Sequence, residues 1–174
     1  MIDERTPMVA AVDSRTSSSS GALVRSLDIT TSAEIAFSHL CEIEKWPVWL
    51  SFLKSARRLD GGPLGIGSEI ALRSAIPGDD EQLFEVDRFI QNHMLSLVGA
   101  YSIRRRIEFR LERKSTIVRL AVRIDYPSYG GALGALVDRM TTRRRLEAAL
   151  GDSLVHLKGL AEFAGANGAP LEDF

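Results

Sequence analysis

The chain has 174 residues, of which 45% are hydrophobic and 26% are charged, and its formal net charge is -1. This composition fits one globular domain with a sizeable core, and it excludes a global electrostatic attraction to nucleic acid or to an anionic membrane. A single cysteine, Cys41, excludes an internal disulfide and is compatible with a reducing compartment, so we expect a cytoplasmic protein. No apolar run reaches the ~18 residues that a membrane span requires.

The N-terminal residues 1–21 end in a run of serines and a glycine and contain few large apolar side chains, which predicts a disordered tail. They also lack the apolar core of a secretory signal. We expect a single domain over residues 22–164 and a flexible C-terminal tail over residues 165–174.

The domain begins with an alternating segment, residues 22–30, that predicts a strand whose apolar face is interrupted by Arg25. A capping threonine or serine then starts a helix over residues 31–44, and Pro47 breaks it. The apolar residues that follow predict a second short helix over residues 48–54.

The middle of the chain consists of alternating segments separated by turn residues, without helical patterns between them. This arrangement predicts an antiparallel meander. The expected strands cover residues 55–59, 68–76, 82–90, 94–102, 103–113 and 116–126.

The last long stretch, residues 131–164, contains no proline and repeats apolar residues at three- and four-residue intervals, which predicts one amphipathic helix. At ~1.5 Å per residue the helix is about 50 Å long and must cross several strands, so the sheet has to wrap around it. We expect residues 146–161 to grip the sheet and residues 132–140 to lie near any pocket mouth. The predicted fold class is α+β.

The last two strands alternate most regularly and place Arg105 on the same apolar face as Ile107 and Phe109. A buried guanidinium needs an acidic or carbonyl partner, from the protein or from a ligand. A solvent-facing arginine near a strand end is the structural alternative. If the turn centres on Lys114 and Ser115, the pairs are Ile107 with Val122, Phe109 with Leu120, and Arg105 with Ile124.

The order of these elements resembles the helix-grip fold of the SRPBCC, START and Bet v 1-like superfamily, in particular its polyketide cyclase/dehydrase branch. The resemblance covers about residues 22–163 and rests on the segments ITTSAE (29–34), EKWPVW (44–49), GPLGIGS (62–68) and LKGLAE (157–162). It implies a cavity between a curved sheet and the long helix. Similar proteins bind lipids, hormones, polyketides or quinones, and only some are enzymes.

The candidate ligand-binding residues follow from that cavity and from the apolar strand faces. Aromatic and aliphatic candidates for the wall are Trp49, Phe84, Ile107, Phe109, Leu120, Val122, Leu136 and Met140. Polar candidates are Arg25, Arg88, Tyr101, Arg105 and Tyr126; Arg88 shares its parity with Phe84 and Val86. Ordinary core packing or solvent exposure is the alternative for each.

The sequence indicates no metal site and no cofactor. The three histidines do not form a ligand-like cluster, and the glycine-rich turn at 62–67 lacks the dinucleotide-binding pattern. An arginine-rich outer strand face (Arg104, Arg106, Arg110, Arg119, Arg123) is interleaved with acids, not with aromatic residues. We therefore expect no nucleic-acid partner.

Three functional hypotheses remain. The first is a module that binds a hydrophobic small molecule, either a lipid or a polyketide-like compound. The second is an enzyme resembling polyketide aromatase/cyclases, which promotes aldol condensation and dehydration and needs two or more of the polar candidates to converge. The third is an interaction protein that docks through its basic outer face. A homodimer is compatible with all three.

Overall fold

The computed structural model describes the backbone of residues 21–75, 81–126 and 134–167. The side chains of residues 102–104, 126 and 134–143 lie outside that description. The two terminal tails expected from the sequence also lie outside it, apart from Gly21 and residues 165–167. The elements in chain order are β1 (Gly21–Ile29), α1 (Ala33–Cys41), η1 (Ile43–Lys45), α2 (Trp46–Trp49), β2 (Leu53–Arg58), β3 (Glu69–Ser74), β4 (Gln82–Ile90), β5 (Met94–Gly99), β6 (Ser102–Lys114), β7 (Ile117–Tyr126) and α3 (Gly134–Asn167).

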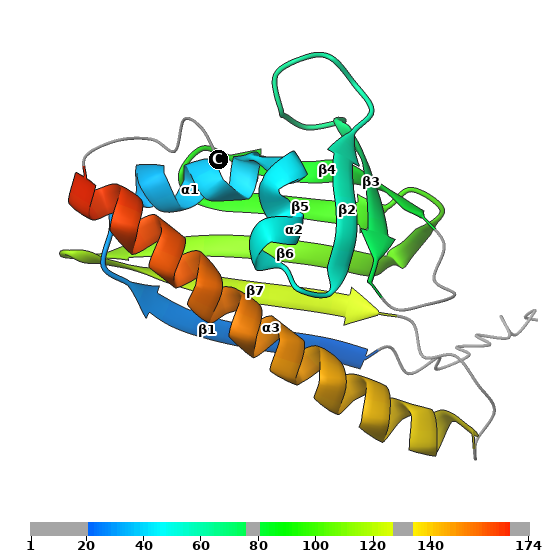
Figure 1. Cartoon of the computed structure of the whole chain (residues 1–174). Coiled ribbons are helices and arrows are strands. Elements are labelled where there is room, and N and C mark those ends of the chain that lie inside the picture. The colour runs from blue at the N-terminus through cyan, green and yellow to red at the C-terminus, as the bar shows by residue number, and fades with distance from the viewer. Residues whose placement is uncertain (1–20, 76–80, 127–133, 168–174) are drawn as a thin grey trace, which may run out of the picture.

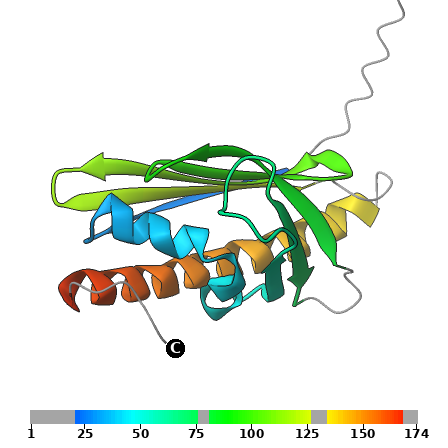
Figure 2. The ribbon, with the colours of Figure 1, turned by 90° about the horizontal axis from the view of Figure 1, so that it is seen from above.

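The strands form one seven-stranded sheet in the order β1-β7-β6-β5-β4-β3-β2, and neighbouring strands are antiparallel. The helices lie together on one face of this curved sheet, where α3 runs diagonally across β1 and β7 (Figures 1 and 2). We call the face that the helices cover the inner face. The predicted α+β helix-grip architecture is confirmed.

The two short helices differ in length from the prediction. In α1, the side chain of Ser32 accepts a hydrogen bond from the Ile35 amide at 3.3 Å, as expected of an N-cap. The second helix, α2, spans Trp46–Trp49, so the predicted helix over 48–54 is wrong. Pro47 lies in the first turn of α2, where a missing amide hydrogen costs nothing, and it therefore starts a helix instead of ending one.

The hairpin of β6 and β7 turns one residue later than predicted. Lys114 pairs with Ile117, so Ser115 and Thr116 form the turn, and Ser115 adopts a positive φ of 50°. Cross-strand partners consequently shift by two residues. The observed pairs are Ile107 with Ile124, Phe109 with Val122, and Leu111 with Leu120. A shift of two leaves every side chain on its predicted face.

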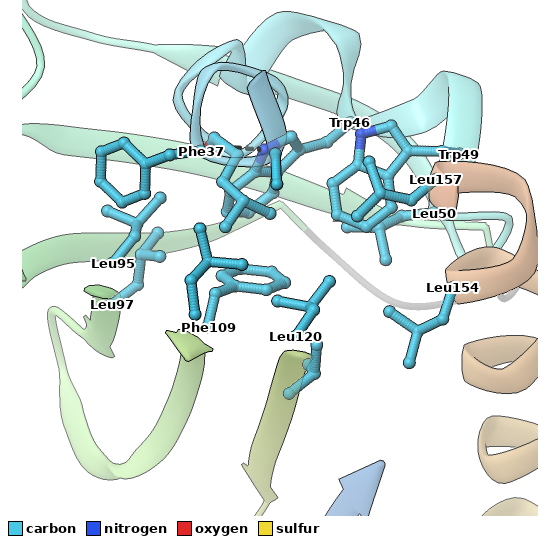
Figure 3. Packing of buried hydrophobic residues seen from close by; sticks show 14 of the residues in the cluster. Phe37, Trp46, Trp49, Leu50, Leu95, Leu97, Phe109, Leu120, Leu154 and Leu157 are labelled. Atoms are coloured by element: carbon cyan, nitrogen blue, oxygen red, sulfur yellow. Dashed lines mark hydrogen bonds between the residues drawn. The ribbon is translucent and has the colours of Figure 1, made fainter. Parts of the chain in front are cut away.

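An aromatic cluster joins the short helices to the centre of the sheet (Figure 3). The ring of Phe109 lies 5.3 Å from that of Trp46 and 6.1 Å from that of Trp49, both in edge-to-face geometry. The Trp46 indole donates a hydrogen bond to the Leu40 carbonyl oxygen at 3.0 Å. Both tryptophans are buried core residues.

The C-terminal half of α3 is attached to the end of β1. Its buried stripe is Leu150, Leu154, Leu157, Ala161 and Ala164. The Glu162 carboxylate accepts a hydrogen bond from the Thr30 amide at 2.7 Å, and Lys158 donates to the Asp28 carbonyl oxygen at 2.7 Å. This half grips the sheet as predicted; the side chains of residues 134–140, expected near a pocket mouth, are outside the description.

Replacing Phe109 with alanine should strongly destabilise the fold, because the ring packs edge-to-face against both tryptophans. We expect a loss of about 3–5 kcal/mol in the free energy of unfolding, measured by urea titration. Val48→Ala, at a position 59% exposed in the same short helix as Trp49, is the control and should change stability by less than about 0.5 kcal/mol. Equal losses in the two variants would contradict this role for the cluster.

Candidate functional site

The inner face is covered unevenly. Phe109 is fully buried under the tryptophans, whereas Ile107, two residues earlier on the same face of β6, is only half-buried. Leu146 is also half-buried, although it lies one helical turn before the buried Leu150. On the neighbouring strands, Ile107 pairs with Ile124 and Ile124 pairs with Leu23, so the side chains next to Ile107 on this face are apolar. We call the region around Ile107 and Leu146, which borders the buried Leu23 and Ile124, the partly covered end.

An ion pair crosses from the sheet to the long helix beside this end. Arg25 Nη2 lies 3.5 Å from Glu147 Oε2, and the two side chains are 45% and 25% exposed. Arg25 Nη1 also donates to the Val24 carbonyl oxygen at 3.3 Å. Arg25 therefore stands at the margin of the inner face, half in solvent, with its charge directed to α3.

The other two candidate arginines occupy different environments. Arg105 is half-buried and interacts with neighbouring groups, close to an irregularity in the pairing of β5 with β6. Arg88 follows a β-bulge: Val86 pairs with Leu97, but Arg88 pairs with Ser96. The bulge moves Arg88 to the exposed outer face, so the predicted shared face with Phe84 and Val86 is not observed.

Most of the predicted wall residues are on the inner face and buried. They are Trp49, Phe84, Phe109, Leu120 and Val122. Because they pack against one another and against the helices, a contact between them and a ligand stays a prediction. Tyr101 is 88% exposed in the turn between β5 and β6, away from this core. The side chains of Tyr126, Leu136 and Met140 are outside the described residues.

Two buried nitrogens stand out, one on the wall candidate Trp49 and one on His39, which was not a candidate from the sequence. Within the described residues, Trp49 Nε1 and His39 Nε2 have no hydrogen-bond partner. Burial lowers the pKa of His39, although the nearby Glu42 carboxylate opposes the shift. Burial also raises the pKa of the Cys41 thiol to about 11, so that this thiol is protonated at neutral pH and is a poor nucleophile.

The described residues contain no group of three or more histidine, cysteine, aspartate or glutamate side chains arranged to bind a metal ion. They also contain no helix that is long and apolar enough to cross a membrane.

The outer face is a network of ion pairs. Arg119 forms two hydrogen bonds with Asp28, at 2.7 and 2.9 Å, and these bonds lower the pKa of the carboxyl group. Further pairs are Arg106 with Asp87 at 2.8 Å, Arg123 with Asp125 at 2.9 Å and Arg110 with Glu108 at 3.0 Å. Arg106, Arg110, Arg119 and Arg123 of this face are therefore each paired with an acid.

Comparisons with known proteins show the fold. A scan against protein-family models finds no match, and a search of curated protein sequences finds none. Among solved structures, the Zhui aromatase/cyclase from Streptomyces sp. R1128 has a TM-score of 0.68 at 11% identity, covering 84% of this chain and 96% of that one. A START superfamily protein from Mycobacterium smegmatis has a TM-score of 0.55 at 15% identity, covering 85% and 99%.

The di-domain aromatase/cyclase StfQ of the steffimycin biosynthetic pathway has a TM-score of 0.66 at 15% identity, covering 86% of this chain. This chain spans about half of that protein, 52%. The chain thus shares the helix-grip fold of these proteins, which is the fold that its sequence predicted.

The buried His39 should make stability dependent on pH. Its folded pKa is below the ordinary value of 6.5, so the unfolded chain binds the proton more readily, and stability falls as the pH decreases from 6.5 toward the folded pKa. One proton limits the slope to about 1.4 kcal/mol per pH unit. Urea unfolding from pH 7.5 to 5 should show this slope in wild type and a smaller one in His39→Leu. The exposed His93, as His93→Gln, is the control; an unchanged slope in His39→Leu would refute the assignment.

Proposed function

We propose that the protein binds a hydrophobic small molecule, lipid or polyketide-like, between the inner face of the sheet and α3, at the partly covered end. The observation that carries the proposal is the half-burial of Ile107 on the same face as the fully buried Phe109. An apolar ligand placed over Ile107 and Leu146 would remove apolar surface from water, which stabilises a complex by about 25 cal/mol per Å². The fold supports the proposal because structurally similar proteins include a START superfamily protein and aromatase/cyclases.

The aromatase/cyclase activity is the alternative, and the fold similarity to two such proteins favours it. Catalysis would need polar side chains that converge beside the bound chain. Of the five polar candidates, Arg88 lies on the outer face and Tyr101 is in solvent, so they support no such convergence. Arg25 and Arg105 remain at this end of the sheet. We therefore prefer binding to catalysis.

Docking through the basic outer face is less well supported. Arg106, Arg110, Arg119 and Arg123 of that face bind carboxylates at 2.7 to 3.0 Å, and a partner would have to compete with these intramolecular pairs. A cytoplasmic location and a homodimer stay predictions.

Binding can be tested with Nile red, an uncharged dye whose emission increases in apolar surroundings. We expect saturable binding to the full chain, weakened at least about ten-fold in Ile107→Trp because the larger side chain fills the space left at the partly covered end. Native mass spectrometry of protein purified from its own cells should show a retained small molecule.

Ile90→Trp is the matched control, since Ile90 is 51% exposed near the end of β4 and distant in register from Ile107. It should leave the Nile red affinity unchanged, and thermal unfolding verifies that both variants are folded. Equal affinity in wild type and Ile107→Trp would contradict the proposed location.

A further inference from the structure

The inner face of β1 contains one charged residue among apolar ones. Leu23 and Ile29 on this face are buried and Leu27 is half-buried, but Arg25 carries a guanidinium group toward α3. A charge at this position is a cost to packing unless it is hydrated or paired. Its carboxylate partner, Glu147, comes from the helix that covers the sheet.

This ion pair is loose. The separation of 3.5 Å and the exposures of 45% and 25% show that water reaches both groups. Solvated pairs of this kind contribute little to stability, so exchanging the partner of Arg25 costs little free energy. Arginine presents a planar fork that matches the two oxygens of a carboxylate.

Other charged residues occur on the elements around the pair. Arg144 lies one helical turn before Glu147 on α3, and Arg105 lies at the beginning of β6. The nearby Asp125 alternates with the inward Ile124 on β7 and is bound to Arg123 at 2.9 Å, so its charge is already balanced. Arg105 and Glu147 each make a further interaction, so of these groups it is the half-exposed Arg25 that a ligand carboxylate would approach.

We propose that Arg25 selects ligands with an acidic head: it binds the carboxylate of a long-chain organic acid whose apolar body lies over Ile107, Ile124 and Leu146. Glu147 forms an ion pair with the Arg25 guanidinium when no acid is bound, and the carboxylate of the ligand replaces Glu147 in this pair when it binds. This inference rests on the proposed binding function and adds to it the chemical class of the ligand. Arg25 is thus a specificity-determining residue at the partly covered end.

Competition between Nile red and two chains of equal length tests the role of the head group. Decanoic acid carries a carboxylate at pH 7.5, whereas decanol has the same apolar body without charge. Wild type should bind decanoate more tightly than decanol. Arg25→Gln should lower the affinity for decanoate about ten-fold, the effect of losing one charge-assisted contact, and leave that for decanol unchanged. Glu147→Gln should raise the affinity for decanoate, because the competing carboxylate is removed.

The pair Arg110 and Glu108 on the outer face provides a matched control, since it is also an arginine-glutamate pair in which the arginine is 52% exposed. Arg110→Gln should leave both affinities unchanged. Arg25→Lys keeps the charge but not the planar fork, and it should retain part of the preference for decanoate. Circular dichroism and thermal unfolding show whether each variant has kept its fold.

The possible results separate this inference from the proposal on which it rests. Equal affinity for decanoate and decanol in wild type, or an equal loss of both in Arg25→Gln, would overturn the role of Arg25 while leaving hydrophobic binding intact. If Arg110→Gln lowered the affinity for decanoate as much as Arg25→Gln does, the role of Arg25 would be overturned as well, since the effect would then reflect net charge alone. If wild type bound neither Nile red nor decanol, both proposals would fall.

Discussion

The packing of Phe109 against Trp46 and Trp49 is the contact on which the arrangement of the inner face depends. Helices of nine and four residues are too short to be stable in isolation, so α1 and α2 exist because their apolar side chains are buried on the sheet. The Trp46 indole also binds the Leu40 carbonyl oxygen and connects the two helices. Once these helices are in place, α3 can cover the remainder of the inner face only along β1 and β7.

This packing divides the inner face into a filled part and a partly covered part. The aromatic rings occupy the centre, where Phe109, Leu120 and Val122 are buried and offer no solvent-accessible surface. Apolar area that is still in contact with water remains at Ile107 and Leu146, nearer the beginnings of β1 and β6. This accessible apolar surface lies at one end of the sheet, near the Arg25 and Glu147 pair, and it is why the proposed ligand is placed there. The aromatic residues thus fill the centre of the inner face, where the family resemblance implied a cavity.

The outer face has a different role in the same sheet. Its arginines bind carboxylates on adjacent strands, as Arg106 does with Asp87 and Arg119 with Asp28. These pairs keep one side of the sheet hydrated and charge-balanced, while the opposite side remains apolar and available to helices and ligand. The contrast is the reason why the proposed ligand contact is assigned to Arg25, on the inner face, and not to the outer arginines.

Local pattern determined which side chains face inward and the order of the elements. Alternation in β6 and β7 assigned Ile107 and Phe109 to one face, and the apolar repeat after residue 145 identified the gripping half of α3, because both patterns depend only on backbone periodicity. Register, the bulge that turns Arg88 outward, and the ring contacts of the tryptophans depend on which strands and helices become neighbours. The pairing of Arg25 with Glu147 also depends on which elements become neighbours, since these residues are brought together only when α3 folds back across β1. Such contacts between residues distant in sequence have no signature in local pattern, so only the tertiary structure decided where the candidate site lies.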